Sequence, residues 1–122
     1  MMEDRGREHH RERMAEALLH EIGALLEGEL SDPRIGLATI SEVQLAPDGK
    51  SAHVYVNVDG DEHEAEETMA GLSAARGYIR REIAIRLRLA RAPELLFHLD
   101  RSQQYGARID ELLTRASRQK KK

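Results

Sequence analysis

Arginine is the residue type in this sequence best suited to chemistry, since fifteen of its nineteen basic residues are Arg. A guanidinium group presents a planar fork of N–H donors that binds phosphate and stacks on flat rings. Seven arginines lie between residues 76 and 101. On a helical wheel of about 100° per residue, four of them share one wide arc: Arg80, Arg81, Arg88 and Arg91. This spacing predicts an exposed cationic ridge.

The charge of the chain is strongly polarised. Although the net charge is −3, residues 76–101 carry +4, from seven Arg against three acids, and the last eight residues carry +5. Residues 41–67 hold eight acids against Lys50, which gives −7. A molecule polarised in this way can dock one face on a polyanion while the other face stays in water.

Several other classes of site lack their signatures. The chain has no cysteine, and its six histidines show no metal-ligand spacing. Gly23 to Gly28 has the spacing of a phosphate loop, but Glu29 and Leu30 stand where Lys and Ser/Thr are required. No nucleophile elbow is present. We therefore expect no enzyme activity, no cofactor and no metal site.

The length of 122 residues predicts one domain, and an aromatic content of 3% predicts an aliphatic core. No apolar run approaches the ~18 residues that span a bilayer, and the charged N-terminus lacks a signal-peptide core. We expect a cytoplasmic protein that does not contact membranes.

Apolar periodicity predicts the elements that must position the arginines. Residues 1–8 read as frayed, residues 9–30 as a helix, and residues 35–45 as a strand with a bulge near Ile40. A turn at residues 47–50 leads into a strand with Val54, Val56 and Val58 on one face, which predicts an antiparallel hairpin.

The second half of the chain should begin with a helix whose N-cap is Asp61, with Glu64 completing a capping box. Small residues at 75–77 predict a kink before the arginine-bearing helix, and residues 94–100 a third strand. Residues 105–113 should form a helix whose Ile109, Leu112 and Leu113 cover the core. Residues 115–122 should be a disordered basic tail. The domain would thus span 9–114.

The order helix, strand, strand, helix, kinked helix, strand predicts a two-layer α+β domain with helices on one face of a three-stranded sheet. It is the type II KH arrangement, and the sequence resembles the bacterial ribosome-binding factor A family over roughly residues 8–114. The resemblance rests on six segments in the same order: ELSDPRIG at 29–36, APD at 46–48 with AHVYV at 52–56, Ala75-Arg76-Gly77 followed by Ile79-Arg80, RLRL at 86–89, PELLF at 93–97 and RIDELL at 108–113.

The resemblance implies a ribosome assembly factor that binds the free 30S subunit and its 16S rRNA. It implies promotion of late maturation, including 16S rRNA 5′-end processing, with importance for cold adaptation. It further implies release by an assembly GTPase in some bacteria and no catalysis. We expect a monomer.

Ordinary KH domains clamp nucleic acid with a GXXG loop, which this chain lacks. At the corresponding junction the family has an Ala-x-Gly kink, here Ala75 and Gly77, so recognition should rely on arginine contacts to phosphates and on RNA shape. The candidate RNA-binding residues are Arg76, Arg80, Arg81, Arg88, Arg91 and Arg34. Arg86 is the poorest candidate, because Glu82 lies four residues before it on the helix.

One alternative function stays open at this point: a protein–protein adaptor on the small subunit without direct RNA contact. Its partner surface would be the first helix or the C-terminal helix.

Overall fold

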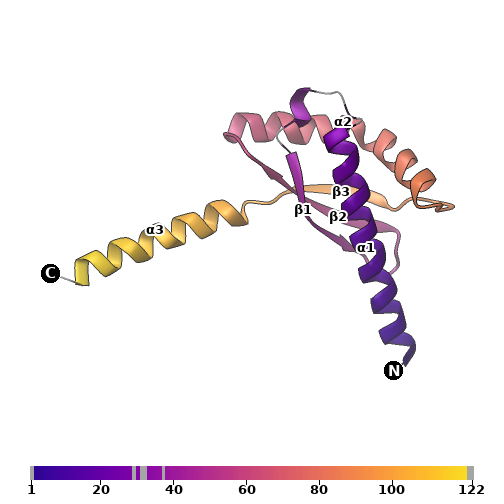
Figure 1. Ribbon diagram of the computed structural model, residues 1–122, viewed down its shortest axis with the longest axis horizontal. Coiled ribbons are helices and arrows are strands. Elements are labelled where there is room, and N and C mark those ends of the chain that lie inside the picture. The colour runs from indigo at the N-terminus through magenta and orange to yellow at the C-terminus, as the bar shows by residue number, and fades with distance from the viewer. Residues whose placement is uncertain (1, 29, 31–32, 37, 121–122) are drawn as a thin grey trace.

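The computed structural model describes residues 2–28, 30, 33–36 and 38–120, apart from the side chains of 2–5, 103–108 and 118–120. Three helices, one 3₁₀ turn and three strands follow each other along the chain (Figure 1). Their bounds are α1 (Met2–Gly28), η1 (Pro33–Ile35), β1 (Ala38–Leu45), β2 (Ser51–Val58), α2 (Glu62–Arg86), β3 (Glu94–Leu99) and α3 (Ser102–Lys120).

The sheet has the order β1-β2-β3, with β1 antiparallel and β3 parallel to the central strand β2. In the sheet register, Val54 at the centre of β2 pairs with Val43 of β1 and with Phe97 of β3. One core cluster joins the inward side chains of the sheet to those of α1 and α2, so both helices cover the same face. This confirms the predicted α+β, type II KH-like fold of two layers.

Strand β2 alternates strictly between buried and half-buried residues, with Ala52, Val54, Val56 and Val58 buried. This alternation confirms the predicted half-buried strand and its hairpin with β1. The register of β1 shifts between Ile40 and Glu42, where the sequence predicted a bulge. Side chains alternate between the two faces of a strand, and the extra residue at the bulge reverses this alternation. Even-numbered Ala38 is therefore buried before the bulge, and odd-numbered Val43 is buried after it.

Helix α1 buries Leu18, Ile22 and Leu25 completely, at steps of three and four residues. It begins at Met2, where the sequence predicted frayed residues up to 8, and ends at Gly28. A helix forms its backbone hydrogen bonds within itself, so it can continue beyond its last buried residue. The start of the helix therefore does not define the start of the domain, and the domain boundary at residue 9 stays a prediction. Thr68 of α2 donates a 2.8 Å hydrogen bond to the carbonyl of Arg34 in η1. Ile35, the first residue of the predicted strand, ends this 3₁₀ turn instead, and β1 begins at Ala38.

Helix α2 starts with the predicted capping box, in which Asp61 accepts from the Glu64 N–H at 2.8 Å. Residues 75–77, where the sequence predicted a kink between two helices, lie within one uninterrupted helix α2, in which Leu72, Ile79 and Ile83 are fully buried. Small residues permit a change of axis without loss of the helical hydrogen bonds. Figure 1 shows the pink first part and the orange second part of α2 running in different directions. The roles of Ala75 and Gly77 in that bend stay a prediction.

The arginine-bearing helix is shorter than the sequence predicted. Leu87 is its C-cap, and Arg88 follows with φ of 54°. A left-handed residue at this position is a common way to end a helix, although glycine is the usual choice. Ile85, in the last turn of α2, is 72% exposed although it is apolar.

Helix α3 projects away from the two-layer body (Figure 1). Its Ile109, Leu112 and Leu113 are 55%, 55% and 63% exposed, so the prediction that they cover the core is wrong. The helix runs to Lys120, through part of the predicted disordered tail, while Lys121 and Lys122 lie outside the described residues. Arg, Gln and Lys favour helix without needing burial. Among the described helices, none is both long enough and apolar enough to cross a membrane.

Candidate nucleic-acid interface

The second part of α2 and the connection to β3 form a shallow surface hollow of about 370 Å³. Three of the predicted arginines line this hollow, namely Arg80, Arg81 and Arg91. Its other lining residues are small: Gly77 with Ala84, Ala90 and Ala92. Small side chains let a bulky ligand such as a sugar-phosphate backbone approach, while the guanidinium groups supply the positive charge.

Arg80 has a structural task at this site. Its Nε donates to the carbonyl of Pro93 at 3.1 Å and its Nη2 to the carbonyl of Ala92 at 3.0 Å. These bonds hold the α2–β3 connection against the helix and thereby position Arg91. The charge of Arg80 still contributes to the hollow, but two of its donors are already used.

Arg81 and Arg91 are exposed, and neither forms an ion pair or hydrogen bond within the described part of the chain. They are therefore the two groups in the hollow best placed to bind an external anion. Arg88 is likewise exposed and without a partner among the described residues, but it does not line the hollow. The predicted single ridge is divided, because α2 ends at Arg86 and the left-handed Arg88 redirects the chain.

Two further candidates lie apart from the hollow. Arg76 is half-buried, with Nη2 donating to Ser73 Oγ at 3.2 Å and with a buried Nε that has no partner in the described structure. Arg34 is exposed in η1, beside the first part of α2. Arg86, the poorest candidate, forms ion pairs with Glu82 at 3.7 Å and Glu21 at 3.6 Å. The expected Glu82 pairing is confirmed.

The separation of charge predicted from sequence runs along α2, from acidic residues at its start to arginines near its end. Glu62 and Glu64 occupy its first turn, while Arg81 lies some twenty residues along, roughly 30 Å away in a helix. Acids near the N-terminus and arginines near the C-terminus both complement the helix dipole. The acidic end therefore lies far from the arginines of the hollow.

The open face of the sheet carries a polar cluster that the sequence did not reveal. His53 Nδ1 lies 2.7 Å from His98 Nε2, and the rings of Tyr55 and His98 stack with centroids 5.3 Å apart. Parallel pairing of β2 with β3 brings these distant residues together. Within the described ranges, no group of three or more His, Asp or Glu could hold a metal ion.

Among the carboxyl groups that the structure describes, Asp100 at the root of α3 has an acidity that its environment clearly changes. A hydrogen bond from the Ser41 hydroxyl and then one from the Ser102 N–H lower the pKa of Asp100 below its ordinary value of 3.8. The ionised carboxylate thus joins the bulge of β1 to the first turn of α3.

Sequence reasoning missed the alanines of the hollow, Ala84, Ala90 and Ala92, and a second cavity near the start of α1. Arg7 and Arg11 line that cavity, in a region predicted to be partly frayed. Their spacing of four residues places both on one helical face and was the available signal.

The two-layer fold with an arginine-lined hollow on its second helix is that of a KH-like domain without the GXXG loop. Comparison with known proteins agrees with this class. The model of the family described as Ribosome-binding factor A matches residues 10–113. A Ribosome-binding factor A from Koribacter versatilis (strain Ellin345) is 60% identical over 120 residues, which cover 98% of each chain.

Solved structures give the same result. The crystal structure of ribosome-binding factor A from Thermus thermophilus is 33% identical, with a TM-score of 0.58, and the match covers 76% of this chain and 93% of that one. A Thermus thermophilus homology model, fitted into a cryo-EM map of a complex of that factor with 30S, is 34% identical with a TM-score of 0.55, covering 75% and 92%. The chain belongs to the ribosome-binding factor A family.

Proposed function

We propose that this protein binds the free 30S ribosomal subunit through phosphates of 16S rRNA. The observation that carries the proposal is the hollow lined by Gly77 and by Arg81 and Arg91, which are exposed and unpaired in the described structure. The likeness to the Thermus thermophilus factor fitted into a 30S complex supports the choice of the small subunit. Arg88, Arg76 and Arg34 would add contacts outside the hollow.

In this proposal the protein is a cytoplasmic, monomeric assembly factor without catalysis. It promotes late maturation of the small subunit, including 16S rRNA 5′-end processing, and it matters most in the cold. An assembly GTPase releases it from the subunit. Cells that lack the protein should accumulate 16S precursor with an unprocessed 5′ end at low temperature.

Co-sedimentation with free small subunits tests the RNA-binding face. Reversal of both free arginines of the hollow, Arg81→Glu with Arg91→Glu, should abolish association while circular dichroism stays unchanged. The matched control is Arg13→Glu with Lys50→Glu, which changes the net charge equally at exposed positions of α1 and of the β1–β2 turn. Retained association of the first variant would contradict the proposal.

The second candidate function is a protein–protein adaptor on the small subunit without direct RNA contact. The exposed apolar side chains of α3, at Ile109, Leu112 and Leu113, favour it. Salt separates the two candidates. If about four phosphates are neutralised, a fourfold rise in salt should weaken binding by about 100-fold, whereas an apolar contact would be nearly unaffected.

A further inference from the structure

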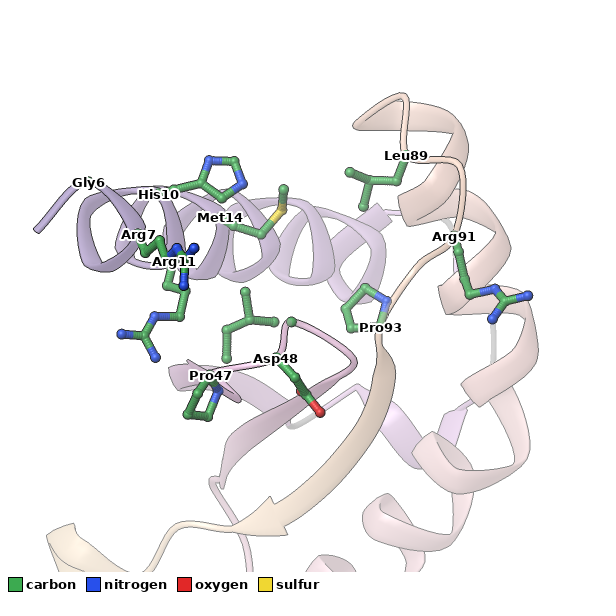
Figure 2. Close-up of a pocket in the computed structure, with 12 residues that line it drawn as sticks. Gly6, Arg7, His10, Arg11, Met14, Pro47, Asp48, Leu89, Arg91 and Pro93 are labelled. Atoms are coloured by element: carbon green, nitrogen blue, oxygen red, sulfur yellow. The ribbon is translucent and has the colours of Figure 1, made fainter. Parts of the chain in front are cut away.

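A second cavity lies away from the arginine hollow, between the start of α1, the β1–β2 turn and the α2–β3 connection (Figure 2). Its volume is about 660 Å³. Pockets that hold small organic ligands have volumes of ~300–1,000 Å³. The cavity is thus large enough for a nucleobase with its sugar.

The floor of this cavity is apolar. Met14, Leu45 and Leu89 line it, and each is a half-buried side chain that packs on the core and leaves part of its surface uncovered. Pro47 and Pro93 contribute flat, rigid edges. Figure 2 shows Met14, Leu89 and Pro93 gathered around the opening. Such a surface favours the face of a planar ring over a charged group.

The rim of the cavity is cationic. Arg7 and Arg11 come from α1 and Arg91 from the α2–β3 connection, against the single carboxylate of Asp48. In Figure 2 the guanidinium groups of Arg11 and Arg91 lie on opposite sides of the apolar floor and point outward. An apolar centre can contact a base, and the two separated cations can each bind one of the phosphates on either side of that base.

We infer that this cavity takes up one unpaired nucleotide of the bound RNA, with its base on Met14 and Leu89 and its flanking phosphates at Arg11 and Arg91. The inference rests on the proposed function. Arg91 lines both this cavity and the arginine hollow, so one strand can pass from one to the other. The carboxylate of Asp48 could accept from an amino group on the base edge.

The test compares two strands of equal charge, a short oligoadenylate and an abasic ribose-phosphate strand of the same length. The wild-type chain should bind oligoadenylate about tenfold more tightly, as measured by fluorescence anisotropy. Met14→Ser should remove this preference, because it removes the stacking surface but no charge. The control Met69→Ser, at another half-buried methionine on the edge of the same core, should keep it.

A rim variant gives a second measurement in case Met14→Ser does not fold. Arg11→Gln with Arg91→Gln should weaken both strands equally and preserve the preference for bases. Equal binding of both strands by the wild type would overturn the inference, and so would a preference that persists in folded Met14→Ser.

Free adenosine monophosphate separates a strand from a mononucleotide. It should not displace oligoadenylate at micromolar concentration. Displacement that depends on Met14 would assign the cavity to a mononucleotide and overturn the assignment to RNA. If the wild type co-sediments with small subunits yet treats both strands alike, only this inference fails. If it does not co-sediment, the proposed function fails.

Discussion

Arg80 donates hydrogen bonds to the carbonyls of Pro93 and Ala92, and so fastens the α2–β3 connection to the helix that carries it. A residue that the sequence suggested for RNA contact is thereby a positioning residue for its neighbour Arg91. The two roles can be separated, since stability and RNA affinity report on different groups.

Arg80→Gln should lower the free energy of unfolding by about 1–3 kcal/mol, because two charge-assisted hydrogen bonds to backbone carbonyls are lost. Arg81→Gln, one residue along and exposed, should change it by less than about 0.5 kcal/mol while weakening small-subunit binding. Urea denaturation and co-sedimentation measure the two effects. Equal stability of both variants would show that the Arg80 bonds contribute little.

Two glycines of α2 should respond oppositely to alanine. A Cβ at Gly71 would lie 3.0 Å from Ile35 Cγ1 and 3.3 Å from Arg34 Cβ, so Gly71→Ala should cost about 1–3 kcal/mol through overpacking. A Cβ at Gly77 meets no atom within 4 Å outside its own stretch of helix. Gly77→Ala should therefore stabilise the protein by about 0.5–1 kcal/mol. A lower melting temperature for Gly77→Ala would instead show that the bend of α2 depends on this glycine.

The pH dependence of stability should contain a contribution from Asp100. Its pKa is lowered in the folded state, first by the Ser41 hydroxyl, so the ionised form stabilises the fold above the ordinary value of 3.8. This contribution disappears as the pH falls through the lower folded-state pKa. Ser41→Ala should thus destabilise the protein at neutral pH and less so in acid. The control Ser73→Ala, far along α2, should show no such pH dependence; chemical denaturation across the pH range compares them.

The apolar side chains of α3 should be dispensable for folding. Leu112→Ala should leave the unfolding free energy unchanged within about 0.5 kcal/mol, because Leu112 is 55% exposed. Leu18→Ala should cost about 2–5 kcal/mol, since Leu18 is fully buried in the core. Calorimetric unfolding compares the two leucines. A large loss for Leu112 would mean that α3 packs on the body in solution.

Local patterns in the sequence determined the hairpin, the bulge at Ile40, the capping box of Asp61 and the buried faces of α1 and β2. Each depends on residues that are close in sequence, so periodicity and turn chemistry are sufficient to predict them. The Glu82 pairing of Arg86 belongs to the same class, because four residues make one helical turn.

Only the tertiary structure decided which arginines are free. Arg80 is engaged by carbonyls twelve and thirteen residues away, and Arg86 also reaches Glu21 on another helix. The end of α2 at Arg86 separated Arg88 from the hollow, and the direction of α3 left Ile109 and Leu112 uncovered. Contacts between distant segments set these outcomes, and a wheel drawn for one helix contains no information about what packs beside it.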